Sequence, residues 1–137
     1  MGSLKHEIFT LLETDAKLTD GSNLGDLLGL SAAAPYGIYF RNPPTGIDYG
    51  TYSTITYFVS SMVGEMPRDI YLLVTAWGDN YEAILNRVKT LLHEINLDTT
   101  DYAVLEMKWE WAGPESYDEF SRIYYQQHRF LIKGIPK

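Results

Sequence analysis

Apolar residues recur at helical spacing in two segments, and the first of these runs from Leu4 to Glu13. Four apolar positions fall at i, i+4, i+7 and i+8, so that they form one stripe on a helix: Leu4, Ile8, Leu11 and Leu12. The stretch that follows, from Ala16 to Ala34, contains three glycines and shows no such period. We therefore expect an amphipathic helix from Leu4 to Glu13. We interpret the stretch from Ala16 to Ala34 as a loop whose leucines pack under the core.

The second helical segment runs from Asp79 to Asn96. Its apolar stripe consists of Tyr81, Ile84, Val88, Leu91, Leu92 and Ile95. Asp79 and Glu82 have the spacing of a capping box, with Asp in place of the usual Ser or Thr. Asn96 can adopt the left-handed conformation in which many helices end. We therefore expect a second amphipathic helix between Asp79 and Asn96.

Alternation between apolar and polar residues predicts the strands. It is clean from Ser53 to Ser61, whereas from Arg68 to Trp77 both faces are apolar. A strand with two apolar faces belongs in the centre of a sheet that is covered on both sides, or covered by a partner chain. The turn signal VGEMP at 63–67 joins these two strands into a hairpin. Three further strands are expected, from Tyr36 to Arg41, from Tyr102 to Trp111 and from Phe120 to Lys133.

The order of these elements is helix, strand, hairpin, helix, hairpin. It predicts an α+β fold with a mostly antiparallel sheet of four to five strands. The N-terminal helix and the second helix, at about Asp79 to Asn96, are expected to pack on one face of that sheet. The 137 residues, of which 45% are hydrophobic, fit one compact domain that covers residues 1–137.

Charge and composition exclude several classes of protein. The chain has 11 Lys and Arg against 18 Asp and Glu, a net charge of −7, which argues against a protein that coats DNA. It has no cysteine, which excludes disulfides, thiolate metal sites and cysteine nucleophiles. No stretch approaches the roughly 20 apolar residues of a membrane span, and the first residues lack the apolar core of a signal peptide. We expect no membrane partner.

Residue patterns typical of catalysis or of metal and cofactor binding are not found. The three histidines, His6, His93 and His128, fall on three separate predicted elements, and no serine lies in a G-x-S-x-G motif. The glycines form neither a dinucleotide-binding nor a phosphate-binding loop. An acidic cluster at 115–119 could supply a carboxylate pair, but a solvated hairpin tip is the simpler interpretation. We therefore expect no catalytic, cofactor-binding or metal-binding residues.

Aromatic residues are the unusual feature of the composition. The chain has 11 Tyr, 3 Trp and 5 Phe, which together make up 14% of its residues. Many of them fall in or beside the expected loops. Tyr and Trp are enriched at protein interfaces, because they bury a large area at a low cost in conformational entropy. Packing within the core accounts for most of these aromatic residues, and the remainder indicates a surface that meets another protein.

Three local patterns carry a resemblance to a known family. They are PYGIY at 35–39, IYLLVTAW at 70–77 followed by DNYEA at 79–83, and YDEFSRIYY at 117–125. With the order of elements around them, from Leu4 to Ile132, the chain resembles the small tail-completion (tail terminator) proteins of long-tailed bacteriophages and prophages. This resemblance implies a non-enzymatic structural protein, which is assembled in the host cytoplasm and resides in the virion at the head–tail interface.

The resemblance also implies partners. Proteins of this family form a ring, often a hexamer, on the last ring of the tail tube; the ring ends tube polymerisation and offers a surface to the head connector. The partners would then be other copies of the chain, the tail tube protein and the head connector protein, with DNA only as passing cargo. The residues that we expect at these contacts are Tyr49, Tyr52, Met62, Glu65, Met66, Arg68, Trp111, Tyr117 and Arg122.

Two other functions stay open at this point. The first is a monomeric binding module that holds a peptide or a small ligand on an aromatic sheet face. The second is an enzyme without a recognised motif, which would need a deep pocket around a carboxylate or histidine with a displaced pKa.

Overall fold

The computed structural model describes residues 2–15, 18, 37–41, 53–61, 69–120 and 122–137. The expected leucine loop lies outside these ranges except for Leu18, as does the expected turn at 63–67. Within the described ranges the helices and strands are α1 (Leu4–Glu13), β1 (Ile38–Phe40), β2 (Thr54–Ser61), β3 (Asp69–Trp77), α3 (Tyr81–Leu92), β4 (Ile95–Asp98), β5 (Tyr102–Ala112), β6 (Ser116–Asp118) and β7 (Ile123–Pro136).

The strands form one sheet whose spatial order is β1-β2-β3-β7-β5-β4, with β6 added to β7. Only β1 and β2 run parallel among the described pairs; the others are antiparallel. The prediction of a mostly antiparallel α+β fold is confirmed. The predicted number of four to five strands was too low, because the described residues form seven. The two that were missed, β4 and β6, have four and three residues, too few for a period to show.

The second helix is shorter than predicted. It ends at Leu92 and not at Asn96, because Glu94 takes a left-handed conformation with φ 62° and redirects the chain. The Glu94 amide then donates to the Met107 carbonyl at 2.6 Å, and Ile95 pairs with Met107 as the first residue of β4. The predicted capping box is also wrong, since the helix begins after Asn80, which makes no side-chain capping bond.

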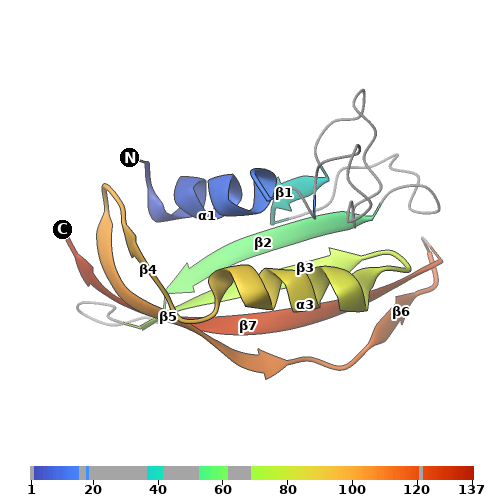
Figure 1. Cartoon of the computed structure of the whole chain (residues 1–137). Coiled ribbons are helices and arrows are strands. Elements are labelled where there is room, and N and C mark those ends of the chain that lie inside the picture. The colour runs from blue at the N-terminus through green and yellow to red at the C-terminus, as the bar shows by residue number, and fades with distance from the viewer. Residues whose placement is uncertain (1, 16–17, 19–36, 42–52, 62–68, 121) are drawn as a thin grey trace.

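Both helices lie against the same side of the curved sheet, as Figure 1 shows. Their apolar stripes join the inward side chains of the strands in one core, whose fully buried members include Ile8, Leu12, Leu72, Leu92 and Phe130. An ion pair also joins the helices, because the Arg87 guanidinium in α3 donates twice to the Asp15 carboxylate just beyond α1, at 2.7 and 3.0 Å. This pair connects α3 directly to the C-terminal end of α1.

The opposite side of the sheet, which we call the distal face, differs from the helix side. On the central strand β3, Leu72 and Val74 are buried towards the helices, whereas Tyr71, Leu73 and Trp77 are half-buried on the distal face. None of the described helices packs on this face. The observed β3 thus has two apolar faces and lies between β2 and β7, as its sequence predicts.

Candidate assembly surface

A hairpin arm extends the sheet beyond the end of β5. We define it as residues 116–120 and 122–125, in which β6 pairs with the first residues of β7. Its turn is held by Asp118, whose carbonyl accepts a hydrogen bond from the Arg122 amide at 2.7 Å and whose carboxylate accepts one from the Phe120 amide at 3.1 Å. Arg122 closes the turn with a φ of 56°, an uncommon conformation for a residue other than glycine. Asp118 therefore contacts the backbone on both sides of position 121.

The hairpin arm presents aromatic rings to solvent. Tyr117 and Tyr124, directly opposite each other across the two strands, are 48% and 50% exposed, and their ring centroids lie 4.9 Å apart. Phe120, at the tip, is 98% exposed. Apolar surface of this kind is unfavourable in water, and contiguous patches of it commonly mark protein interaction sites. The arm has the character of an interface element.

A second aromatic group lies on the distal face around Arg129 of β7. The Arg129 guanidinium lies 4.9 Å from the ring centre of Tyr71 and 5.5 Å from that of Trp111, and 2.6 Å from the Glu110 carboxylate. Cation–π attraction and the ion pair together hold Trp111 in place, although its side chain is 44% exposed. Trp111 is thus a positioned aromatic surface of the kind that often anchors an interface.

The distal face also contains a cavity of about 380 Å³, which we call the distal hollow. One wall is Trp77, whose ring stacks on Tyr125 at 4.6 Å between centroids and whose indole N–H donates to the Thr56 hydroxyl at 2.9 Å. Trp111, Pro114, Gln127 and Arg41 are among the other lining residues. The lining therefore combines three aromatic rings with the polar side chains of Thr56, Thr75, Ser116 and Gln127, a mixture that can hold a flat apolar group with polar groups at its edge.

Arg41 brings positive charge to the distal hollow. Its guanidinium lies 5.2 Å from the ring centres of both Phe40 and Phe58, and its side chain is exposed. It forms no ion pair with any carboxylate of the described residues. The hollow therefore offers a partner one cation beside several aromatic rings.

The structure places three of the nine predicted contact residues on this surface. Trp111 lines the distal hollow, Tyr117 lies on the hairpin arm, and Arg122 lies in its turn. The other six, Tyr49, Tyr52, Met62, Glu65, Met66 and Arg68, lie outside the described residues. Sequence reasoning missed Phe120, which it assigned to a strand that in fact begins at Ile123. The acidic residues Asp118 and Glu119, just before Phe120, could have indicated a turn at this position.

A polar cavity of about 410 Å³ lies on the helix side, between α3 and the strands β5 and β7. His128 in its lining is buried, and its Nδ1 accepts a hydrogen bond from the Trp109 indole N–H at 3.0 Å. The Lys89 ammonium lies 3.9 Å from the centre of the Trp109 ring. Burial, and secondly the charge of Lys89, lower the pKa of His128, so its imidazole is neutral near pH 7.

The same cavity contains an acidic group that is already bonded. Glu115, between β5 and β6, accepts a hydrogen bond from the Tyr81 hydroxyl at the start of α3, which raises the pKa of Tyr81 to about 12. This bond joins the start of α3 to the segment between β5 and β6, and the bond between Trp109 and His128 joins β5 to β7.

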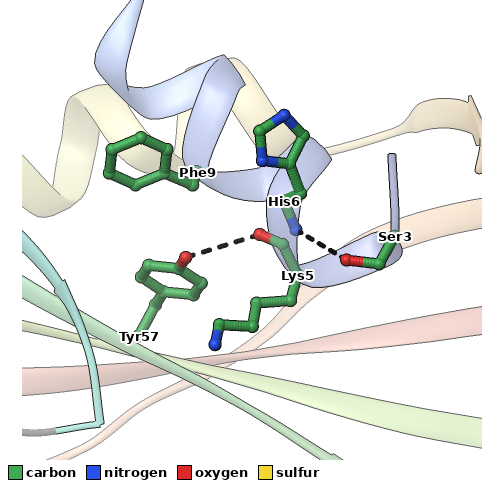
Figure 2. A pocket seen from close by; sticks show the side chains of 5 residues that line it. All are labelled: Ser3, Lys5, His6, Phe9 and Tyr57. Atoms are coloured by element: carbon green, nitrogen blue, oxygen red, sulfur yellow. Dashed lines mark hydrogen bonds between the residues drawn. The ribbon is translucent and has the colours of Figure 1, made fainter. Parts of the chain in front are cut away.

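A third cavity, of about 370 Å³, lies at the start of α1 (Figure 2). Ser3, Lys5, His6 and Phe9 line it from the helix and Tyr57 lines it from β2. The Tyr57 hydroxyl donates to the Lys5 carbonyl at 3.4 Å, and the Ser3 hydroxyl accepts from the His6 amide at 3.3 Å and so caps the helix. Burial raises the pKa of Tyr57, which therefore stays protonated. Of these contacts, the bond from Tyr57 joins α1 to the sheet.

Two further features complete the description. No group of three His, Asp or Glu side chains in the described segments has the arrangement of a metal site. Among the helices described, none has the length and apolar character required to cross a membrane.

Comparison with known proteins shows a likeness in fold. No protein-family model matches the chain, and no curated protein matches it. Among solved structures, the chain is similar to a chain in the virion of a native gene transfer agent particle, with 15% sequence identity and a TM-score of 0.67. The match covers 98% of this chain and 96% of that one. At this identity the likeness is one of fold, and it extends over nearly the whole length of both chains.

Proposed function

We propose that the chain is a non-enzymatic assembly protein of a phage-like virion. The observation that carries the proposal is the full-length likeness in fold to a chain of a virion particle. The exposed aromatic hairpin arm supports it, because Tyr117, Phe120 and Tyr124 would be buried in an assembly but face water in a single chain.

The more specific proposal follows the tail-terminator resemblance. Copies of the chain form a ring, a hexamer in this proposal, at the head-proximal end of a tail tube. The ring ends tube polymerisation and joins the tail to the head connector. Identical subunits that contact one another head to tail close into a ring when the rotation between them closes. Each subunit carries a net charge of −7, so an acidic channel would let DNA pass without binding to it.

The decisive experiment is a capping assay. Purified protein is mixed with purified tail tubes, and negative-stain electron microscopy with gold-labelled protein records where it binds. We expect label at one end of each tube, and we expect tubes to stop growing when fresh tube subunits are added. Label along the tube wall, or continued growth at the labelled end, would refute the terminator role. A complete lack of binding to tubes and heads would refute the assembly role as well.

A second candidate function is a monomeric module that binds a peptide or a small ligand. The distal hollow favours it, because its stacked Trp77 and Tyr125 could hold an apolar group. Light scattering separates the two candidates at high protein concentration: a ring protein increases in mass, whereas a binding module stays monomeric. Quenching of tryptophan fluorescence by short aromatic or proline-containing peptides is expected only if the second candidate is correct.

A further inference from the structure

The tip of the hairpin arm is shaped as a single apolar knob. Phe120 is 98% exposed, yet the turn that carries it is fixed by two hydrogen bonds to Asp118. These two bonds hold the described residues on either side of position 121 and reduce the backbone freedom that they lose on binding. Because Phe120 is almost fully exposed, the knob cannot be explained by packing within its own subunit.

A receptor for such a knob exists on the same chain. The distal hollow has a volume of about 380 Å³ and is walled by Trp77, Tyr125, Trp111 and Pro114. Aromatic rings pair favourably edge to face or offset, so these aromatic walls suit a phenyl group, while the polar side chains of Thr75, Ser116 and Gln127 line the rest of the hollow. The hollow lies at the base of the hairpin arm, where Ser116 pairs with Tyr125, whereas Phe120 lies at its tip. Because Phe120 is almost fully exposed, it does not fill its own hollow.

The charges beside the knob and the hollow are complementary. Glu119, next to Phe120, is exposed, and no described side chain forms an ion pair with it. Arg41, at the hollow, likewise has no carboxylate partner among the described residues. A second copy whose Phe120 enters the hollow would bring a carboxylate towards this guanidinium.

We infer that the hairpin arm of one copy docks into the distal hollow of the next copy, with Phe120 inserted between the aromatic rings and Glu119 opposite Arg41. The inference rests on the proposed function and specifies the contact by which copies associate. Knob and hollow are different surfaces of the chain, so the contact is head to tail. Each copy inserts its own knob into one neighbour, and its hollow receives the knob of another neighbour.

The first test measures self-association by analytical ultracentrifugation over a range of concentrations. Phe120→Ser should weaken association about tenfold or more, as the loss of a central aromatic anchor does. Ile135→Ser is the matched control, because Ile135 is also an exposed apolar residue of the β5–β7 region but lies far from the hollow. It should leave association unchanged. Equal effects of the two variants, or a wild-type protein that stays monomeric, would overturn the inference.

The second test reverses the charges. Glu119→Arg and Arg41→Glu should each weaken association, and the double variant should restore it towards the wild-type value. Each variant is first checked for wild-type thermal unfolding, so that misfolding is not mistaken for lost contact. Two additive losses in the double variant would overturn the assigned pair.

The third test uses the absence of cysteine in the chain. Glu119→Cys and Arg41→Cys proteins carry one thiol each, and under mild oxidation a mixture should give mainly the crosslink between position 119 and position 41. Random pairing, or no crosslink, would overturn the inference. This result is independent of the capping assay. If the wild type associates and Phe120→Ser does not, the contact is supported whatever the result of the capping assay. If the crosslink fails while capping succeeds, only the contact is wrong.

Discussion

The pH dependence of stability provides a direct test of the His128 environment. His128 is only 6% exposed, and its Nδ1 accepts the Trp109 indole N–H, so a second proton would have to displace that hydrogen bond. The ammonium of Lys89 opposes the same protonation. The pKa of His128 is therefore lower in the folded protein than the value of about 6.5 expected for the unfolded chain.

The sign and the size of the effect follow from proton linkage. Below about pH 6.5 the unfolded chain binds a proton that the folded protein does not, so folding is favoured less as the pH falls. The contribution of His128 to the free energy of unfolding is fully present above about pH 6.5. It is lost progressively as the pH falls from there to the pKa of His128 in the folded protein. One proton changes the free energy of unfolding by at most about 1.4 kcal/mol per pH unit. Between about pH 7.5 and about pH 5.5 we expect His128 to lower the free energy of unfolding by at most about 1.4 kcal/mol, because only the last pH unit lies below the unfolded pKa.

The assay is urea unfolding at these two pH values, followed by tryptophan fluorescence. The comparison variant is His128→Asn, whose amide oxygen can still accept the Trp109 hydrogen bond but does not titrate. We expect the loss of stability on acidification to be smaller in the variant, within the same limit of about 1.4 kcal/mol. An equal pH effect in both proteins would refute the reasoning and would mean that other groups cause it.

Three further predictions follow from local geometry. Arg87→Ala breaks the ion pair between the helices and removes two hydrogen bonds from the Asp15 carboxylate, which is 7% exposed, so thermal unfolding should show a loss of about 2 kcal/mol. Gly78→Ala should cost about 2 kcal/mol in urea unfolding, because Gly78 has φ 121° and an added Cβ would lie 2.6 Å from the Ser53 hydroxyl oxygen. Tyr81 should ionise at about pH 12 in an ultraviolet titration, and Glu115→Gln should lower that value; an unchanged value would show that the carboxylate does not hold the phenol.

Elements with a long regular period could be predicted from the sequence. The core face of β3 and the stripe of α3 appear where their patterns place them, because each pattern repeats over several turns or pleats. The end of α3 could not be predicted, because Ile95 fits both the helical stripe and the strand that it joins. The left-handed conformation of Glu94 decides between them, and it depends on tertiary pairing with Met107.

The candidate surface was partly predictable. Aromatic abundance indicated an interface, and Trp111 and Tyr117 are among the exposed aromatic residues. The distal hollow could not be found in the same way, because Trp77 and Tyr125 are 48 positions apart in sequence and meet only through the register of β3 on β7. Phe120 was assigned to a strand because it is apolar, and the turn that excludes it depends on the side chain of Asp118.

The position of β7 has a consequence for synthesis. This strand follows all the other described strands in sequence, yet it lies between β3 and β5 and pairs with both over most of its length. While a ribosome is still translating β5, β3 lacks one of its two neighbours, and the sheet stays divided into two separate parts. Contacts so distant in sequence form slowly. The nascent protein should therefore depend on protection from aggregation until its final strand emerges, and only then should it become competent to meet other copies.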